Sequence, residues 1–173
     1  DGVDVYFDNN GVQAKGTFDS NDRFHDKDTG GLIYNQFITV KDKTYYIDDE
    51  GRPVKGLAVI KNTEYFFDKQ KGAQIKGDFA VNGKYYDGIT GALVTNSYVR
   101  VGSDWYYVNS KGKRLKGAQI INNVAVYFNP QNGKQLKGGF DEDGYFYDKD
   151  SGAKTDLGKN HYVQINDAWY YIG

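Results

Sequence analysis

The stretch VYFNPQNGKQLKG at residues 126–138 recurs as YFFDKQKGAQIKG at residues 65–77 and as VYFDNNGVQAKG at residues 5–16. Each copy starts with β-favouring aromatic residues, continues through a polar turn with a glycine, and ends in Gln-x-Lys-Gly. This order of residue types predicts a β-hairpin. The glutamines recur at a constant separation of 61 residues, which predicts a repeat architecture.

Two further hairpin motifs lie inside each period of 61 residues. One reads KYYDGITG at residues 84–91, and the other reads WYYVNSKGKRLKG at residues 105–117. Helical periodicity is absent, so we expect an all-β chain. Hairpins of this size cannot bury an apolar face alone, and we therefore expect them to stack into a β-solenoid. A flat β-sandwich is the alternative, but it does not explain the constant register.

The repeats fill the chain from end to end. We therefore expect residues 1–173 to form a single repeat-built domain. The sequence begins and ends inside a repeat, and we interpret it as a piece of a longer protein.

The composition narrows the classes of partner. The formal net charge is -1, so no basic field attracts nucleic acid or an anionic membrane, and a neutral ligand is expected. The 16 tyrosines suit surfaces that are half buried and half hydrated. The absence of cysteine excludes a disulfide framework and a thiolate metal site. We expect no metal and no cofactor.

The pattern Gly-x-x-x-Lys-Gly occurs five times, and an apolar residue precedes the lysine in every copy. Because neighbours in a strand point to opposite faces, this apolar residue is predicted to face the core. The lysine and the residue two before it then share the outer face. That residue is Gln in the first motif but Pro53 or Arg114 in the third. A Gln amide donates and accepts, as a sugar hydroxyl does; an exposed or turn-bonding Gln is the alternative. The lysine can equally be structural, its stem covering a ring.

The aromatic doublet, the glycine turn and the Gln-x-Lys-Gly ending resemble the glucan-binding repeats of the glucansucrases, the secreted glucan-synthesising enzymes of lactic acid bacteria. The resemblance extends over essentially the whole chain. It implies a non-catalytic, extracellular or cell-surface bacterial domain outside the catalytic barrel, which retains α-glucan such as dextran or isomalto-oligosaccharides. We expect a monomer.

In the family, the sugar pockets combine a stacking aromatic ring with a Gln and a Lys. By resemblance, the Gln and Lys residues are Gln13 with Lys15, Gln74 with Lys76, and Gln135 with Lys137. The expected aromatic ligand-binding residues are Tyr6, Tyr65, Tyr86, Tyr127 and Tyr147. One copy departs from the pattern, because Phe24-His25 stands where the others have Tyr85-Tyr86 and Phe146-Tyr147.

Other functions remain open. A choline-binding cell-wall anchor shares the aromatic hairpin design, but a cage for a quaternary ammonium prefers several Trp rings, and only Trp105 and Trp169 are present. A toxin-like receptor-binding repeat and a structural spacer are further alternatives. Catalysis is disfavoured, because the aspartates recur after the doublets, where Asp caps a turn, and glycosidases need a unique pair of acids. The turn Asp26-Lys27-Asp28 lacks the EF-hand pattern of a calcium site.

Overall fold

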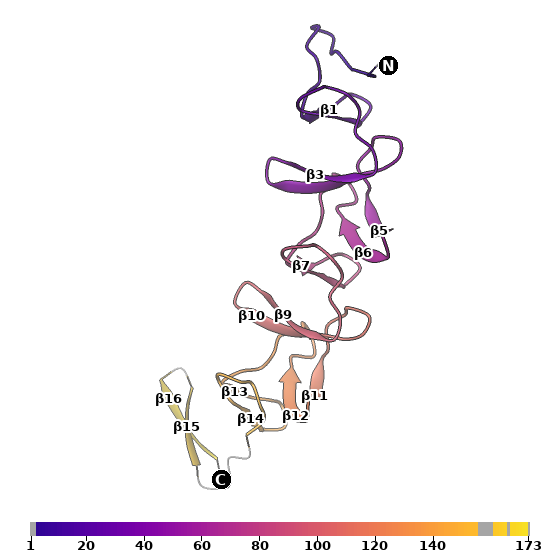
Figure 1. The fold of residues 1–173 in the computed structure, drawn as a ribbon. Helices are drawn as coiled ribbons and strands as arrows, with labels where there is room; N and C mark the ends of the chain where they lie inside the picture. Colours follow the sequence, from indigo (N-terminus) through magenta and orange to yellow (C-terminus); the bar gives the residue numbers. More distant parts are fainter. Residues whose placement is uncertain (1–2, 156–160, 166, 173) are drawn as a thin grey trace. The chain divides into compact units, whose positions relative to one another are not determined.

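The computed structural model describes residues 3–155, 161–165 and 167–172, and this part of the chain contains strands and turns but no helix (Figure 1). The strands are β1 (Thr17–Phe18), β2 (Phe24–His25), β3 (Gln36–Val40), β4 (Lys43–Ile47), β5 (Gly56–Ile60), β6 (Thr63–Phe67), β7 (Asp78–Phe79), β8 (Tyr85–Tyr86), β9 (Ser97–Val101), β10 (Asp104–Val108), β11 (Gly117–Ile121), β12 (Val124–Phe128), β13 (Gly139–Phe140), β14 (Phe146–Tyr147), β15 (His161–Ile165) and β16 (Ala168–Ile172).

Each strand pairs with its neighbour along the chain, so the described strands form two-stranded sheets. The longer hairpins turn tightly over two residues. In β5–β6 these are Lys61 and Asn62, with φ of 48° and 63°, and in β11–β12 they are Asn122 and Asn123, with φ of 50° and 64°. Two successive residues with positive φ are the signature of a type I′ turn, whose twist matches that of the flanking strands. The predicted hairpins are confirmed.

A second kind of turn follows each aromatic strand, and an Asp or Asn side chain closes it. Asp68 Oδ1 accepts hydrogen bonds from the backbone N–H groups of Gln70 and Lys71, at 3.0 and 2.5 Å. Asn129, the equivalent residue in the next copy, accepts from the backbone N–H groups of Gln131 and Asn132 in the same way. The hydrogen bonds from Lys71 and Gln70 lower the pKa of Asp68 below its ordinary value. The prediction that these aspartates cap turns is confirmed.

The chain divides into two compact units, residues 1–80 with 86–93 and residues 81–85 with 94–173. Within each unit, successive segments join through short bridges. The residues that follow the turn after an aromatic strand pair with the last residue of that strand. The residues that follow the next hairpin pair with a residue nearer the start of the aromatic strand. These bridges are Phe67–Gln74 and Tyr65–Ala92 in the first unit, and Phe128–Gln135 and Val126–Ala153 in the second. Hairpins thus stack on their neighbours, as in a repeat solenoid. A single domain over residues 1–173 remains a prediction.

The core of each unit consists of aromatic and β-branched residues from the hairpins. Phe66, Ala80 and Tyr86 form a buried cluster against which Ile75 packs. In the second unit, Ile121, Val126 and Phe128 form a similar cluster, with Leu115 packed against it. Ile75 and Leu115 are the apolar residues that precede the lysine in their motifs. Their predicted inward orientation is confirmed.

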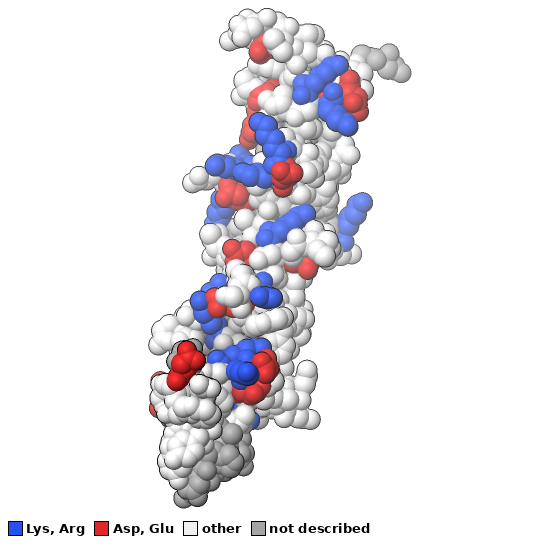
Figure 2. Space-filling view, turned by 90° about the vertical axis from the view of Figure 1, so that its left-hand side faces the viewer, with Lys and Arg blue, Asp and Glu red and all other residues white. Residues whose placement is uncertain are grey.

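The surface carries charges of both signs. Figure 2 shows lysine and arginine interspersed with aspartate and glutamate on the face displayed, without a broad patch of one sign. Within the described residues, no helix has the length and hydrophobicity to cross a membrane. In the same part of the chain, no group of three or more His, Asp or Glu residues is placed to hold a metal ion.

Candidate functional site

The Gln and Lys of the first motif both reach the turn of the next hairpin. Gln74 Nε2 donates to Thr90 O at 3.1 Å, and Lys76 Nζ donates to Ile89 O at 3.1 Å. The other copies repeat these bonds: Gln13 to Thr29 O at 3.5 Å, Lys15 to Asp28 O at 3.0 Å, Gln135 to Ser151 O at 3.4 Å, and Lys137 to Asp150 O at 2.7 Å. Each pair therefore shares one face, as expected, and links two successive hairpins.

The third motif uses the same positions in a related way. Lys116 Nζ donates to Gln131 O at 2.8 Å, and Arg114 donates to Asn132 O at 3.4 Å. Lys55 instead forms an ion pair with Asp22 at 3.0 Å. Backbone carbonyl bonding is therefore common to both motifs, which supports a structural role for the lysines. A ligand-binding role for the Gln and Lys residues remains a prediction.

A hollow of about 360 Å³ lies between the third copy of the first motif and the loop after it. Tyr127 and Gln135 line it on one side, and Phe140, Asp141 and Glu142 line it on the other. The Tyr127 hydroxyl lies 3.1 Å from Glu142 Oε1 across this hollow. Burial and the Glu142 carboxylate raise the pKa of Tyr127, so the hydroxyl keeps its proton and donates to the carboxylate.

The first copy contains an equivalent hollow of about 260 Å³. It is lined by Tyr6, Gln13, Phe18, Asp19 and Ser20, which stand in the repeat where the third copy has Tyr127, Gln135, Phe140, Asp141 and Glu142. The hydroxyls of Tyr6 and Ser20 lie 2.8 Å apart and close the hollow as the Tyr127–Glu142 bond does. The same small site is therefore built twice, once in each unit.

The middle copy carries apolar residues at these positions. Phe66 replaces the tyrosine, and Ala80 and Val81 stand where the third copy has Asp141 and Glu142. Phe66 is only 4% exposed and packs with Ala80 and Tyr86. This copy therefore keeps Gln74 and Lys76 but lacks the hydroxyl and carboxylate of the other two sites.

The second residue of the aromatic pair in the short strands β2, β8 and β14 is buried in every copy. His25, Tyr86 and Tyr147 are 1%, 0% and 2% exposed. Tyr147 donates to Asp141 Oδ2 at 2.9 Å, and Tyr86 donates to Glu64 Oε1 at 2.8 Å. We expected Tyr86 and Tyr147 among the ligand-binding rings, but burial leaves neither of them a face for stacking.

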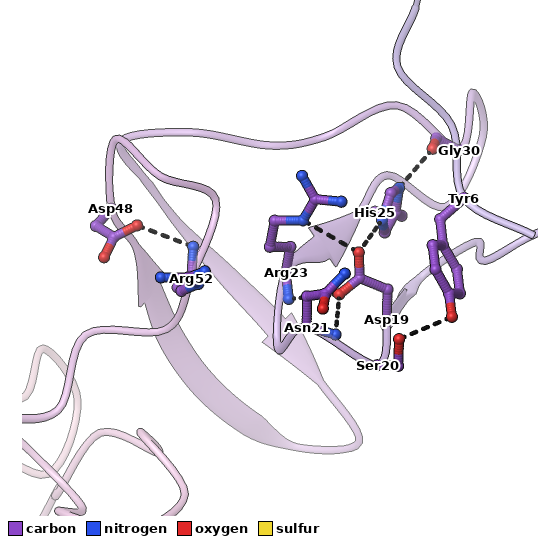
Figure 3. Close-up of polar contacts among 9 residues, drawn as sticks. All are labelled: Tyr6, Asp19, Ser20, Asn21, Arg23, His25, Gly30, Asp48 and Arg52. Atoms are coloured by element: carbon purple, nitrogen blue, oxygen red, sulfur yellow. Dashed lines mark hydrogen bonds and ion pairs between the residues drawn. The ribbon is translucent and has the colours of Figure 1, made fainter.

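His25, which replaces the tyrosine of the other copies, also forms a hydrogen bond with a carboxylate, as Tyr147 does with Asp141. His25 Nε2 lies 3.1 Å from Asp19 Oδ2, and its Nδ1 lies 2.8 Å from Gly30 O (Figure 3). Asp19 also accepts from Arg23 Nε at 3.2 Å. Burial alone raises the pKa of Asp19, but hydrogen bonds from the Arg23 backbone, His25 and the Asn21 backbone outweigh it and lower this pKa. The carboxylate thus holds the floor of the first hollow in its ionised form.

Family models match most of the repeats. The model described as choline-binding repeat matches residues 54–98 and 115–156, about half of the chain. The chain belongs to the choline-binding repeat family. A second family model, of cell wall binding repeats, matches residues 35–52, 96–113 and 160–173 of this chain.

Relatives of this choline-binding repeat chain include glucansucrases. It is 33% identical to glucosyltransferase-S of Streptococcus mutans serotype c over 96% of its own length, and 32% identical to glucosyltransferase-I of Streptococcus downei over 98%. It spans only 12% and 14% of those two enzymes. The expected resemblance to glucansucrase repeats is confirmed.

The fold has solved counterparts. Choline binding protein F of Streptococcus pneumoniae superposes with a TM-score of 0.61 at 24% identity, covering 90% of this chain and 55% of that one. The predicted all-β fold of hairpin repeats is confirmed.

Tyr65, the remaining aromatic residue expected to bind ligand, occupies a different position in the repeat from Tyr6 and Tyr127. Tyr65 stands where the other copies have Val5 and Val126, and its ring packs edge-on against Phe37 at 5.3 Å between centroids. It is therefore not equivalent to the tyrosines that line the hollows.

Trp105 was not among the expected ligand-binding residues. Its ring is 37% exposed, and Lys137 Nζ lies 5.6 Å from the ring centroid. The only sequence signal for it is its place at the start of the third motif.

Proposed function

We propose that this chain is a non-catalytic carbohydrate-binding module that retains α-glucan. The observation that carries the proposal is the recurrence of one hollow in the first and third copies. In each copy a partly buried tyrosine, Tyr6 or Tyr127, lies beside a glutamine, and its hydroxyl bonds to the opposite wall. The tyrosine, the glutamine and the hollow that they line thus recur together, which supports a common binding role in these two copies.

The chemistry of a pyranose suits such a hollow. Its axial C–H groups can pack on an aromatic ring, while its hydroxyls exchange hydrogen bonds with an amide and a carboxylate. In the third copy Tyr127 and Phe140 supply rings, and Gln135 and Glu142 supply polar atoms. Each net hydrogen bond contributes about 1 kcal/mol, so one site is expected to bind in the micromolar to millimolar range. Two sites on one chain raise retention of a polymer.

The three copies are not proposed to contribute equally. Gln74 and Lys76 belong to the middle copy, where Phe66 and Ala80 replace the polar groups. We expect this copy to bind glucan more weakly than the pockets at Gln13 with Lys15 and at Gln135 with Lys137. Retention by dextran or isomalto-oligosaccharides is therefore assigned mainly to the first and third copies.

The relatives give the proposal its biological setting. They are glucosyltransferases, and this chain corresponds to a small part of them. We place the module in an auxiliary role beside a glucan-synthesising glucosyltransferase, outside the cell or on the bacterial surface. The catalytic activity is assigned to other parts of such an enzyme.

Choline binding is the second candidate, and one feature of the site favours it. Tyr127 and Phe140 lie with the carboxylates of Asp141 and Glu142 around the same hollow. Aromatic rings with nearby negative charge attract a quaternary ammonium. The glucan proposal is preferred because the relatives that match nearly the whole chain are glucosyltransferases.

Affinity electrophoresis in gels with and without dextran tests the proposal, and calorimetric titration with isomaltotriose and with choline separates the two ligands. We expect retardation by dextran and heat from isomaltotriose but not from choline. The variant Tyr127→Phe/Glu142→Val places the middle-copy residues in the third copy and should weaken retention. Wild-type migration unaffected by dextran would refute the glucan proposal, and saturable heat from choline alone would replace it with the second candidate.

A further inference from the structure

A second hollow, of about 520 Å³, adjoins the Tyr127 site in the third copy. Gln119 and Ile120 from β11 line it, together with Asp143, Tyr145 and Lys154 from the following hairpin. None of these residues belongs to the Gln-x-Lys-Gly segment, so the repeat motif gave no reason to expect a site here.

The two hollows share a wall. Tyr127 and Asp141 line both of them. Tyr127 is held by its bond to Glu142 on one side, and its ring lies 5.7 Å from that of the buried Tyr147. Asp141 Oδ2 accepts from the Tyr147 hydroxyl, while Asp141 Oδ1 accepts from the Tyr145 backbone at 2.9 Å. The wall that the two hollows share is therefore held in position by these contacts.

The second hollow has the mixed character of a carbohydrate subsite. Tyr145 is 49% exposed although Lys154 Nζ lies 3.0 Å from its ring centroid, and Ile120 is 77% exposed. These groups offer apolar surface for the C–H face of a sugar, and Gln119, Asp143 and Lys154 offer polar atoms of both kinds for its rim. Because Asp143 and Lys154 carry charges of opposite sign, the hollow suits a neutral ligand.

The other copies lack this set of residues. The middle copy has Ala58, Lys84 and Leu93 at the positions of Gln119, Tyr145 and Lys154. The first copy has Arg23 at the position of Tyr145. These residues of the second hollow are thus found together only in the third copy of the repeat, so a subsite here is considered for that copy alone.

We propose that the third copy binds consecutive glucosyl units of one α-glucan chain, with one part of the chain in the Tyr127–Gln135 hollow and the next part in the hollow of Gln119 and Tyr145. The inference rests on the glucan-binding function proposed above and adds a second subsite to it. Tyr145 and Gln119 then determine the length of chain that the third copy recognises.

Site-resolved titration tests this arrangement. The side-chain amide signals of Gln135 and Gln119 report on the two hollows separately in NMR spectra of the full chain. We expect isomaltose to shift the Gln135 signal, and isomaltopentaose to shift both signals. The variant Tyr145→Lys carries the middle-copy residue. It should raise the Kd for isomaltopentaose about three- to tenfold, as expected for the loss of one aromatic contact, and leave the Kd for isomaltose unchanged.

The outcomes separate the two proposals. If neither glutamine signal shifts with any oligosaccharide, the glucan-binding function is wrong and the second subsite with it. If only Gln135 responds and Tyr145→Lys binds isomaltopentaose like wild type, the second subsite alone is wrong. A second variant, Gln119→Ala, also introduces a residue that the middle copy tolerates. It should lower the affinity for isomaltopentaose, so a misfolded Tyr145 variant does not leave the question open.

Discussion

The side-chain amide of Gln74 lies against Gly91, in the space that a β-carbon on that glycine would occupy. Gly91 has a φ of 72°, a conformation that side-chain-bearing residues seldom adopt. The same contact joins Gln13 to Gly30 and Gln135 to Gly152. The glutamines and the glycines that recur with the same spacing are therefore two halves of one contact between successive hairpins.

Replacing Gly91 by alanine should destabilise the protein, because the new β-carbon is strained at positive φ and also displaces the Gln74 amide. We expect a loss of about 1–3 kcal/mol in the free energy of unfolding, measured by urea denaturation. Gly83→Ala is the matched control, since Gly83 has a φ of 76° but nothing within 4 Å of the added carbon. Equal losses in the two variants would show that the contact with Gln74 contributes nothing.

The sequence was sufficient to predict the hairpins, the turn caps and the inward apolar residues. Each of these depends on local chemistry, such as the paired Asn122 and Asn123 at a tight turn. The partners of the glutamines and lysines were not predictable, because strand alternation identifies the face of a side chain but not what lies opposite. Here the opposite group is a backbone carbonyl, such as Thr90 O for Gln74.

The doublets show where alternation fails. Tyr85 and Tyr86 are consecutive residues of one short strand, yet they are 7% and 0% exposed. Both side chains of this strand are buried, so the alternation of buried and exposed residues does not hold here. The hollows were missed for a related reason, because Asp141 and Glu142 lie in a loop outside the repeated Gln-x-Lys-Gly pattern.

Disabling one hollow should affect polymer and oligosaccharide differently. Tyr127→Phe removes the hydroxyl that closes the third-copy hollow and introduces the residue that the middle copy carries. We expect titration with isomaltotriose to show about half of the sites weakened, by about fivefold for a loss of about 1 kcal/mol. Dextran retention should fall by a larger factor than the affinity for isomaltotriose, because one polymer then engages two sites at once less often.

Tyr6→Phe is the corresponding change in the first copy and should give the same pattern. If dextran affinity in the single variants fell only in proportion to the number of sites, the copies would act independently. Comparing both single variants with the double variant in the same dextran gels distinguishes these results.

The turn aspartates should make the fold sensitive to acid. The pKa of Asp68 is lowered in the folded protein relative to its ordinary value of 3.8, so the unfolded chain binds the proton more tightly. Its stabilising effect is therefore complete above that value and is lost as the pH falls through the lower, folded-state pKa. Asp68→Asn should keep the cap, as Asn129 does, and reduce the loss of unfolding free energy between about pH 5 and about pH 2.

The reverse change supplies the control for this prediction. Asn129→Asp should introduce a titrating cap and make the same pH dependence steeper. Urea denaturation at a series of pH values measures both. Parallel curves for wild type and Asp68→Asn would mean that this turn has the same proton affinity in the folded and unfolded states.

Removing the carboxylate beneath the first hollow should cost more stability than removing any exposed charge. Asp19 and His25 have side chains that are 0% and 1% exposed, and Asp19→Ala leaves His25 Nε2 without its acceptor. We expect a loss of about 2–4 kcal/mol in unfolding free energy. Adding His25→Tyr to this variant recreates the Ala80 and Tyr86 pair of the middle copy and should recover part of the loss. A double-mutant cycle from urea denaturation gives the coupling, and strictly additive effects would show that the two side chains do not stabilise each other.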